Sequence, residues 1–142
     1  MGVAYVNQVN YAQAIRCFQK AIEIDPNDAG AYNNMGAAYN QQENYAQAIR
    51  CFQKAIEIDP NNAKAYNNMG VAYVNQENNA QAIRCYQKAI EINPNFAIAY
   101  YFMGNTYSNQ GNTAKQIECY KKAAQLGNTG AQEWLRDNGD NW

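Results

Sequence analysis

The sequence predicts an all-α protein, a right-handed superhelical solenoid built from antiparallel helix pairs in 34-residue repeats. The three prolines are spaced 34 residues apart, at Pro26, Pro60 and Pro94. The same spacing separates every cysteine and every methionine, at Cys17, Cys51, Cys85, Cys119, Met1, Met35, Met69 and Met103. Segments 29–62 and 63–96 are identical at 26 of 34 positions. One helix pair of this length buries too little surface alone, so the repeats are expected to stack on their neighbours.

The first helix of a repeat is predicted over residues 29–42. Apolar residues at i, i+3, i+4 and i+7 form one face of that helix, made of Tyr32, Met35, Gly36 and Tyr39. The glycine in this face allows the paired helix to approach to about 8–10 Å. The same pattern recurs in the next two repeats.

The second helix of a repeat is predicted over residues 45–58. Asn44 precedes it as a candidate N-cap, and Gln47 completes a capping pattern three residues later. The helix is expected to end at Asp59, because the residue before a proline is disfavoured in helical conformation. Helix pairs are therefore expected over residues 1–24, 29–58, 63–92 and 97–126.

The two ends of the chain depart from the repeat. Met1-Gly2 aligns with Met35-Gly36, so the first repeat is expected to be truncated, either because the chain is a fragment or because translation starts there. A final helix is expected over residues 131–138, with Trp134 in the position of Tyr100. The predicted organisation is one domain with a truncated repeat at 1–28, full repeats at 29–62, 63–96 and 97–130, and a capping helix and tail at 131–142.

Composition excludes several classes of function. Eleven Lys and Arg against twelve Asp and Glu leave no basic excess for binding nucleic acid. No apolar run approaches the ~18 residues of a membrane span. The chain has no histidine and a single serine, Ser108, which excludes histidine acid–base catalysis and Ser–His nucleophile pairs. We therefore expect no enzyme activity, no cofactor, no metal, no nucleic acid and no membrane partner.

The four cysteines invite a disulfide or zinc interpretation. Equivalent residues of stacked repeats lie at least ~8–10 Å apart, whereas a disulfide needs Cα atoms within ~7 Å. One thiol per repeat also cannot form a tetrahedral zinc site. Plain packing residues are expected, and unpaired thiols favour a reducing, cytoplasmic location.

The motif of residues 29–62 resembles the tetratricopeptide repeat family. The matching residues are Tyr32, Met35-Gly36, Tyr39, Ala48, Phe52, Ala55 and Pro60. Segment 63–96 repeats the match, whereas segment 97–130 has Gln116 in place of the alanine and Gly127-Asn128 in place of Asp-Pro. The resemblance implies a scaffold that binds a protein or peptide segment in a concave groove lined by the first helices.

By this resemblance, the groove residues are Asn33, Ala37, Asn40, Lys64, Asn67, Val71, Val74, Tyr101 and Asn105. The asparagines either pair with a peptide backbone, since an amide donates and accepts, or are merely common at these positions. Tyr101 and Phe102 replace an Asn-Asn pair and either form a peptide pocket or pack under the last helix. The alternative function is structural: a self-associating or engineered repeat module, with head-to-tail contacts through exposed repeat ends.

Overall fold

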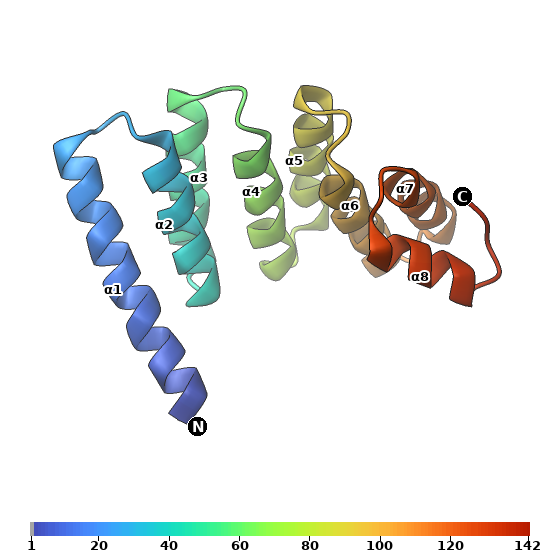
Figure 1. The fold of residues 1–142 in the computed structure, drawn as a ribbon, viewed down its shortest axis with the longest axis horizontal. Helices are drawn as coiled ribbons and strands as arrows, with labels where there is room; N and C mark the ends of the chain where they lie inside the picture. The colour runs from blue at the N-terminus through green and yellow to red at the C-terminus, as the bar shows by residue number, and fades with distance from the viewer. Residues whose placement is uncertain (1) are drawn as a thin grey trace.

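The computed structural model describes the backbone of residues 2–142 and the side chains from Gln8 onward. Helices follow one another along the whole described chain (Figure 1). Their bounds are α1 (Gly2–Ile24), α2 (Ala29–Gln41), α3 (Tyr45–Ile58), α4 (Ala63–Asn75), α5 (Asn79–Ile92), α6 (Ala97–Asn109), α7 (Thr113–Gln125) and α8 (Thr129–Asp137). No helix in this range is long and apolar enough to cross a membrane.

Successive helices pack as antiparallel pairs, α2 with α3, α4 with α5, and α6 with α7, and each pair stacks on the next. The first helices also contact one another directly, α2 with α4 and α4 with α6. They therefore form the inner side of the stack, which Figure 1 shows as a curved row of helix pairs. This arrangement confirms the predicted all-α solenoid.

The core of each pair forms where an aromatic ring lies against a glycine. A Cβ added at Gly36 would lie 2.6 Å from the Phe52 ring. A Cβ at Gly70 would lie equally close to Tyr86. Phe52 and Tyr86 are almost completely buried. The glycine predicted from the sequence to permit close helix approach does so by making room for this ring.

The turn between the two helices of a repeat is also the same in each unit. The backbone N–H of Asn44 donates to the Tyr39 carbonyl at 2.9 Å, and Glu43 between them has a φ of +61°. Glu77 takes the same conformation in the next repeat, with a φ of +60°. The Asn44 side chain then accepts from the Gln47 N–H, so the predicted N-cap is present.

The prediction of a helix pair over residues 1–24 is wrong, because α1 is one continuous helix of 23 residues. Asn10 aligns with the capping residue Asn44, but it lies inside α1 and caps no second helix. The chain does not fold back at this point (Figure 1). The reason lies at Val9, which aligns with Glu43 and Glu77. A β-branched residue strongly disfavours the positive φ that this turn requires, so the helix continues through it.

The last helix begins two residues earlier than expected. Asn128 caps α8 by accepting from the Ala131 N–H at 2.8 Å, as Asn62 caps α4 by accepting from the Ala65 N–H at 3.0 Å. Leu135 therefore takes the buried position of Met69, four residues after that alanine. Gln132, not Trp134, occupies the position of Tyr100. In place of the Asp-Pro turn of the earlier repeats, Gly127 takes a φ of +95°, and the connection between α7 and α8 is shorter than the connection between α3 and α4.

Candidate functional site

Two adjacent cavities lie on the inner side of the stack, and together they form what we call the inner groove. The larger cavity, of about 420 Å³, is lined by Ala37, Asn40, Gln41, Glu43, Tyr45, Asn68, Val71, Asn75 and Phe102. The smaller, of about 190 Å³, is lined by Val71, Val74, Asn75, Tyr86, Phe102, Asn105 and Thr106. Val71, Asn75 and Phe102 line both, so the two cavities are neighbours across α4 and α6.

The structure separates the predicted groove residues into two sets. Those that line the inner groove are Ala37, Asn40, Val71, Val74 and Asn105. Those that do not line it are Asn33, Lys64, Asn67 and Tyr101. Asn33 and Asn67 are buried at 5% and 4% exposure, whereas Lys64 is exposed at the start of α4. The floor of the groove thus lies towards the C-terminal halves of the first helices.

Two asparagines of adjacent first helices are hydrogen-bonded to each other. Asn68 Nδ2 on α4 donates to Asn33 Oδ1 on α2 at 3.3 Å, which joins adjacent first helices. At the equivalent place one repeat later, the donor is replaced by Phe102. The buried Oδ1 of Asn67 therefore has no donor among the described residues. This hydrogen bond is therefore not repeated between α4 and α6, and pairing of the asparagines with a peptide backbone stays a prediction.

Tyr101 and Phe102 lie in different surroundings. Tyr101 stacks on Tyr120 with ring centroids 5.4 Å apart, and it contacts Gly130 of α8. Phe102 faces the inner groove and contacts Tyr86, with ring centroids 6.2 Å apart. Of the two interpretations left open by the sequence, packing under the last helix therefore describes Tyr101, and a position in a pocket describes Phe102.

The groove also contains residues that the sequence did not indicate, among them Glu43, Tyr45, Tyr86 and Thr106. Glu43 lies in the turn after α2, and Tyr45 is the first residue of α3, so both lie beside the end of α2. Tyr86 of the third repeat aligns with Phe52 of the second, so it adds a hydroxyl that the second repeat lacks. Burial raises the pKa of Tyr86 well above its usual value, so its hydroxyl stays protonated beside Thr106.

Asn40, which lines the larger cavity, has a buried acceptor without a partner among the described residues. Its Oδ1 is buried and finds no hydrogen-bond donor within the part of the chain that the structure describes. A buried acceptor left unpaired costs roughly 1–3 kcal/mol, so most such groups have a partner. Asn105, in the smaller cavity, is already engaged, because the Tyr120 hydroxyl donates to its Oδ1. Of these two amide oxygens, that of Asn105 has a donor and that of Asn40 has none among the described residues.

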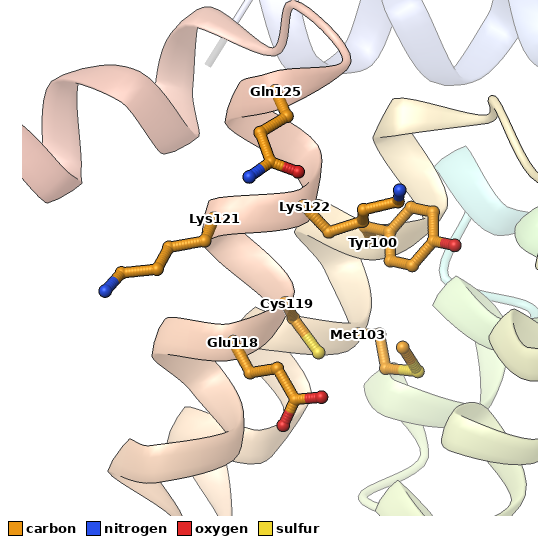
Figure 2. Close-up of a pocket in the computed structure, with 7 residues that line it drawn as sticks. All are labelled: Tyr100, Met103, Glu118, Cys119, Lys121, Lys122 and Gln125. Carbon is orange, nitrogen blue, oxygen red and sulfur yellow. The ribbon is translucent and has the colours of Figure 1, made fainter. Parts of the chain in front are cut away.

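A third cavity, of about 380 Å³, lies outside the inner groove between α6 and α7 (Figure 2). Met103 and Cys119 in its wall belong to the buried cluster that joins the third and fourth repeats. Lys121, at its rim, points away from Tyr100 and forms an ion pair with Asp140 at 3.5 Å. This cavity is thus an open surface depression beside a repeat interface, and none of the predicted site residues lines it.

The cysteines behave as packing residues in three of the four repeats. Cys51, Cys85 and Cys119 are buried, and burial raises the pKa of each thiol from 9.0 to about 11. A thiol that stays protonated is a weak nucleophile and a weak metal ligand. Within residues 2–142, no three His, Cys, Asp or Glu side chains gather as a metal site would require.

Comparison with known proteins agrees with this geometry. A family model described as "TPR repeat" matches residues 2–42 and 36–77, and two described as "Tetratricopeptide repeat" match residues 63–96 and 85–118. No curated protein sequence matches the chain.

Among solved structures, the crystal structure of MamA is 31% identical over 82% of this chain and 68% of its own, with a TM-score of 0.75. A second crystal structure of MamA protein is 30% identical over 86% and 67%, also at 0.75. A MamA RS-1 ArsTM double mutant is 25% identical over 89% and 71%, at 0.74. Repeats of this kind are protein–protein interaction scaffolds. By its repeat motif, its stacked helix pairs and these matches, the chain belongs to the tetratricopeptide repeat family.

Proposed function

We propose that the protein is a non-catalytic scaffold that binds an extended segment of a partner protein in its inner groove. The observation that carries this proposal is the pair of adjoining cavities across α2, α4 and α6. Their combined walls offer apolar contacts from Val71, Val74 and Phe102 beside amides that both donate and accept. A binding site of this kind combines shape with a few polar groups that orient the ligand.

An extended segment suits this groove better than a compact ligand. Both cavities are open and shallow, and they follow one another across successive first helices. In an extended chain, alternate side chains point the same way at a spacing of roughly 7 Å. Two such side chains can enter neighbouring cavities while the backbone between them meets Asn75, which lines both. Binding of such segments is typically in the micromolar range, about 8 kcal/mol.

The proposal is tested with a displayed library of natural peptides, selected on the full chain. The groove variant is Ala37→Arg, because Ala37 is exposed on α2 and a long side chain there fills the larger cavity. The matched control is Ala114→Arg, an equally exposed helical alanine on α7. We expect selected peptides to lose binding to Ala37→Arg and to keep it with Ala114→Arg. Equal binding to both variants would place the ligand elsewhere.

Head-to-tail association of chains is a second candidate function, and one observation favours it. Cys17 on α1 is exposed, whereas its counterparts Cys51 and Cys85 are buried against the preceding repeat. The face of α1 that carries Cys17 is thus the face that receives a neighbouring repeat elsewhere in the stack. A second copy, presenting its last helices, has the shape to cover it.

Association is tested by light scattering after size exclusion over a wide range of concentration. A mass that rises above 16.0 kDa with concentration supports it. We expect Cys17→Glu to prevent the rise, because a charge on that face disfavours contact, whereas Ala37→Arg in the groove leaves it unchanged. A constant mass would rule this candidate out.

A further inference from the structure

We propose that the larger cavity of the inner groove binds a cationic side chain, arginine or lysine, from the bound segment, while an apolar side chain of the same segment enters the smaller cavity. This inference rests on the proposed peptide-binding function and deepens it by naming the chemistry of the ligand. Four independent features of the larger cavity favour a cation.

The first feature is the charge of its walls. Glu43 carries the single carboxylate among the residues that line the two cavities, and no lysine or arginine among the described residues lines either cavity. Lys64 of α4 is a full helix length away, in the first turn, whereas Asn75 of the lining is in the last. A cationic ligand thus meets an acid without competition from a basic side chain of the chain itself.

The second feature is the direction of the inner helices. Gln41 and Asn75 are the last residues of α2 and α4, and both line the larger cavity. The C-terminal end of a helix carries partial negative charge, which favours a nearby cation. Neither helix has a basic residue in its last turn to offset this charge. The cavity therefore lies beside two helix ends that have no basic residue of their own.

The third feature is a pair of aromatic rings, Tyr45 and Phe102, in the lining. A guanidinium or ammonium group within about 6 Å of a ring centre is attracted to the face of the ring. Phe102 takes this position only in the fourth repeat, where the preceding repeats have asparagine. The ring also lines both cavities.

The fourth feature is the unpaired acceptor Asn40 Oδ1 described above. Arginine has five N–H donors and no acceptor, and lysine has three donors. A small movement of the Asn40 amide would give this buried oxygen a donor from either side chain. An acidic or purely apolar ligand side chain would leave it unpaired.

The two cavities also set a spacing in the ligand. Because they share Val71, Asn75 and Phe102, their occupants are neighbours on one face of the bound segment. In an extended chain these are residues two apart, roughly 7 Å from each other. The expected ligand motif is an apolar residue and a basic residue separated by one position.

The test uses immobilised hexapeptides in a serine–threonine background, each with one leucine and a variable residue two positions before or after it. The variable residue is arginine, lysine, citrulline or glutamate; citrulline copies the shape of arginine without its charge. The fluorescently labelled full chain is the probe. The variant is Glu43→Gln, and the matched control is Glu133→Gln, an exposed residue of α8 that changes the net charge equally.

We expect arginine peptides to bind the chain roughly fivefold tighter than citrulline peptides, the effect of one partly exposed charge pair. Glutamate peptides should bind most weakly, Glu43→Gln should abolish the arginine preference, and Glu133→Gln should retain it. If arginine and citrulline peptides bind equally and Ala37→Arg still blocks both, the cation site is wrong while the peptide groove stands. If no peptide binds, in this array or from the natural library, the groove proposal is wrong and the cation site falls with it.

Discussion

Single positions in the turns decide where helices stop. Glu43, Glu77 and Gly111 occupy the same place in three repeats, and all have positive φ. Only glycine takes this conformation without steric cost, because a Cβ crowds the neighbouring carbonyl. Two of the three turns therefore hold a residue that is strained relative to glycine, and the strain is local because the positions are exposed.

Replacing Glu77 by glycine is expected to raise the free energy of unfolding by about 0.5–1 kcal/mol. The relief of the left-handed strain outweighs the greater freedom of glycine in the unfolded chain. Urea denaturation followed by circular dichroism measures the change. The reverse substitution, Gly111→Glu, serves as the control and should lower stability by a similar amount, since open space surrounds this turn. A decrease on Glu77→Gly would contradict the argument.

Gly70→Leu is expected to destabilise the protein far more than Lys64→Leu. At Gly70 even a Cβ would lie 2.6 Å from Tyr86, so the pair of helices must separate, and overpacking costs roughly 1–3 kcal/mol. Lys64 is exposed in the same helix, and its replacement should change stability by at most about 0.5 kcal/mol. Thermal denaturation of both variants measures the difference, and equal shifts in Tm would show that the assignment of helix faces is wrong.

Whole elements follow from the same local chemistry. In α2, α3, α4 and α5, an aspartate or asparagine side chain caps the first turn. Helix α6 lacks such a bond, because Phe96 occupies the cap position. Helix α1 differs most, since Val9 at the turn position removes the break and joins two predicted helices into one.

Val9→Gly is therefore expected to restore the break and fold the first half of α1 back as a helix pair. Spin labels placed through unnatural amino acids at positions 3 and 16 report this change, because these positions align with the exposed residues Ala37 and Arg50. Thirteen residues of continuous helix separate the labels by about 20 Å, whereas a helix pair brings the backbones to about 10 Å. The control Val9→Ala, which favours helix, should keep the long distance. A long distance in Val9→Gly as well would show that the turn residue does not decide the break.

At the scale of the whole molecule, stability depends on contacts between neighbouring repeats. Cys85 illustrates this, because it lies in one cluster with Ile49 and Phe52 of the preceding repeat. Cys51 and Cys119 make the corresponding contacts with Ile15 and Ile83. Each buried thiol therefore lies at a different interface between repeats. Ionisation of a thiol makes the stability of its interface depend on pH.

The free energy of unfolding is expected to fall as pH rises from about 9 to about 11. In that range the thiols of the unfolded chain, with a pKa of 9.0, have lost protons that the folded chain keeps, because burial raises the pKa of Cys51, Cys85 and Cys119 to about 11. The native state binds more protons, so stability declines with pH, and below pH 9 this dependence is absent. Urea midpoints across this range measure the slope.

Cys85→Ala should reduce the slope, whatever it does to stability at neutral pH. Cys17→Ala, which removes an exposed thiol, is the control and should leave the slope unchanged. An identical slope in Cys85→Ala and the parent chain would show that the buried thiol does not contribute to the pH dependence.

The sequence determined by itself the fold class, the helix pairs of the second to fourth repeats and their capping asparagines. These features depend on local chemistry, since periodic apolar residues, prolines and caps act within a few residues. The continuity of α1 was also predictable from local chemistry, because Val9 is a β-branched residue at the turn position. The two-residue shift of α8 was readable in the same way, because Gly127-Asn128 repeats the turn-and-cap pattern of Gly111-Asn112.

Only the tertiary structure decided which groove residues meet. Tyr101 and Phe102 are adjacent in sequence, yet one lies under α8 and the other in the groove, because neighbouring helical residues point about 100° apart and the last helix covers one direction. Asn33 and Asn67 are equivalent in sequence, yet Asn33 accepts from Asn68, whereas Asn67 Oδ1 has no donor among the described residues and Phe102 stands at the position of that donor. The sequence of one repeat determines where its own helices begin and end. A site lined by three successive first helices also depends on how neighbouring repeats stack, which the sequence of a single repeat does not determine.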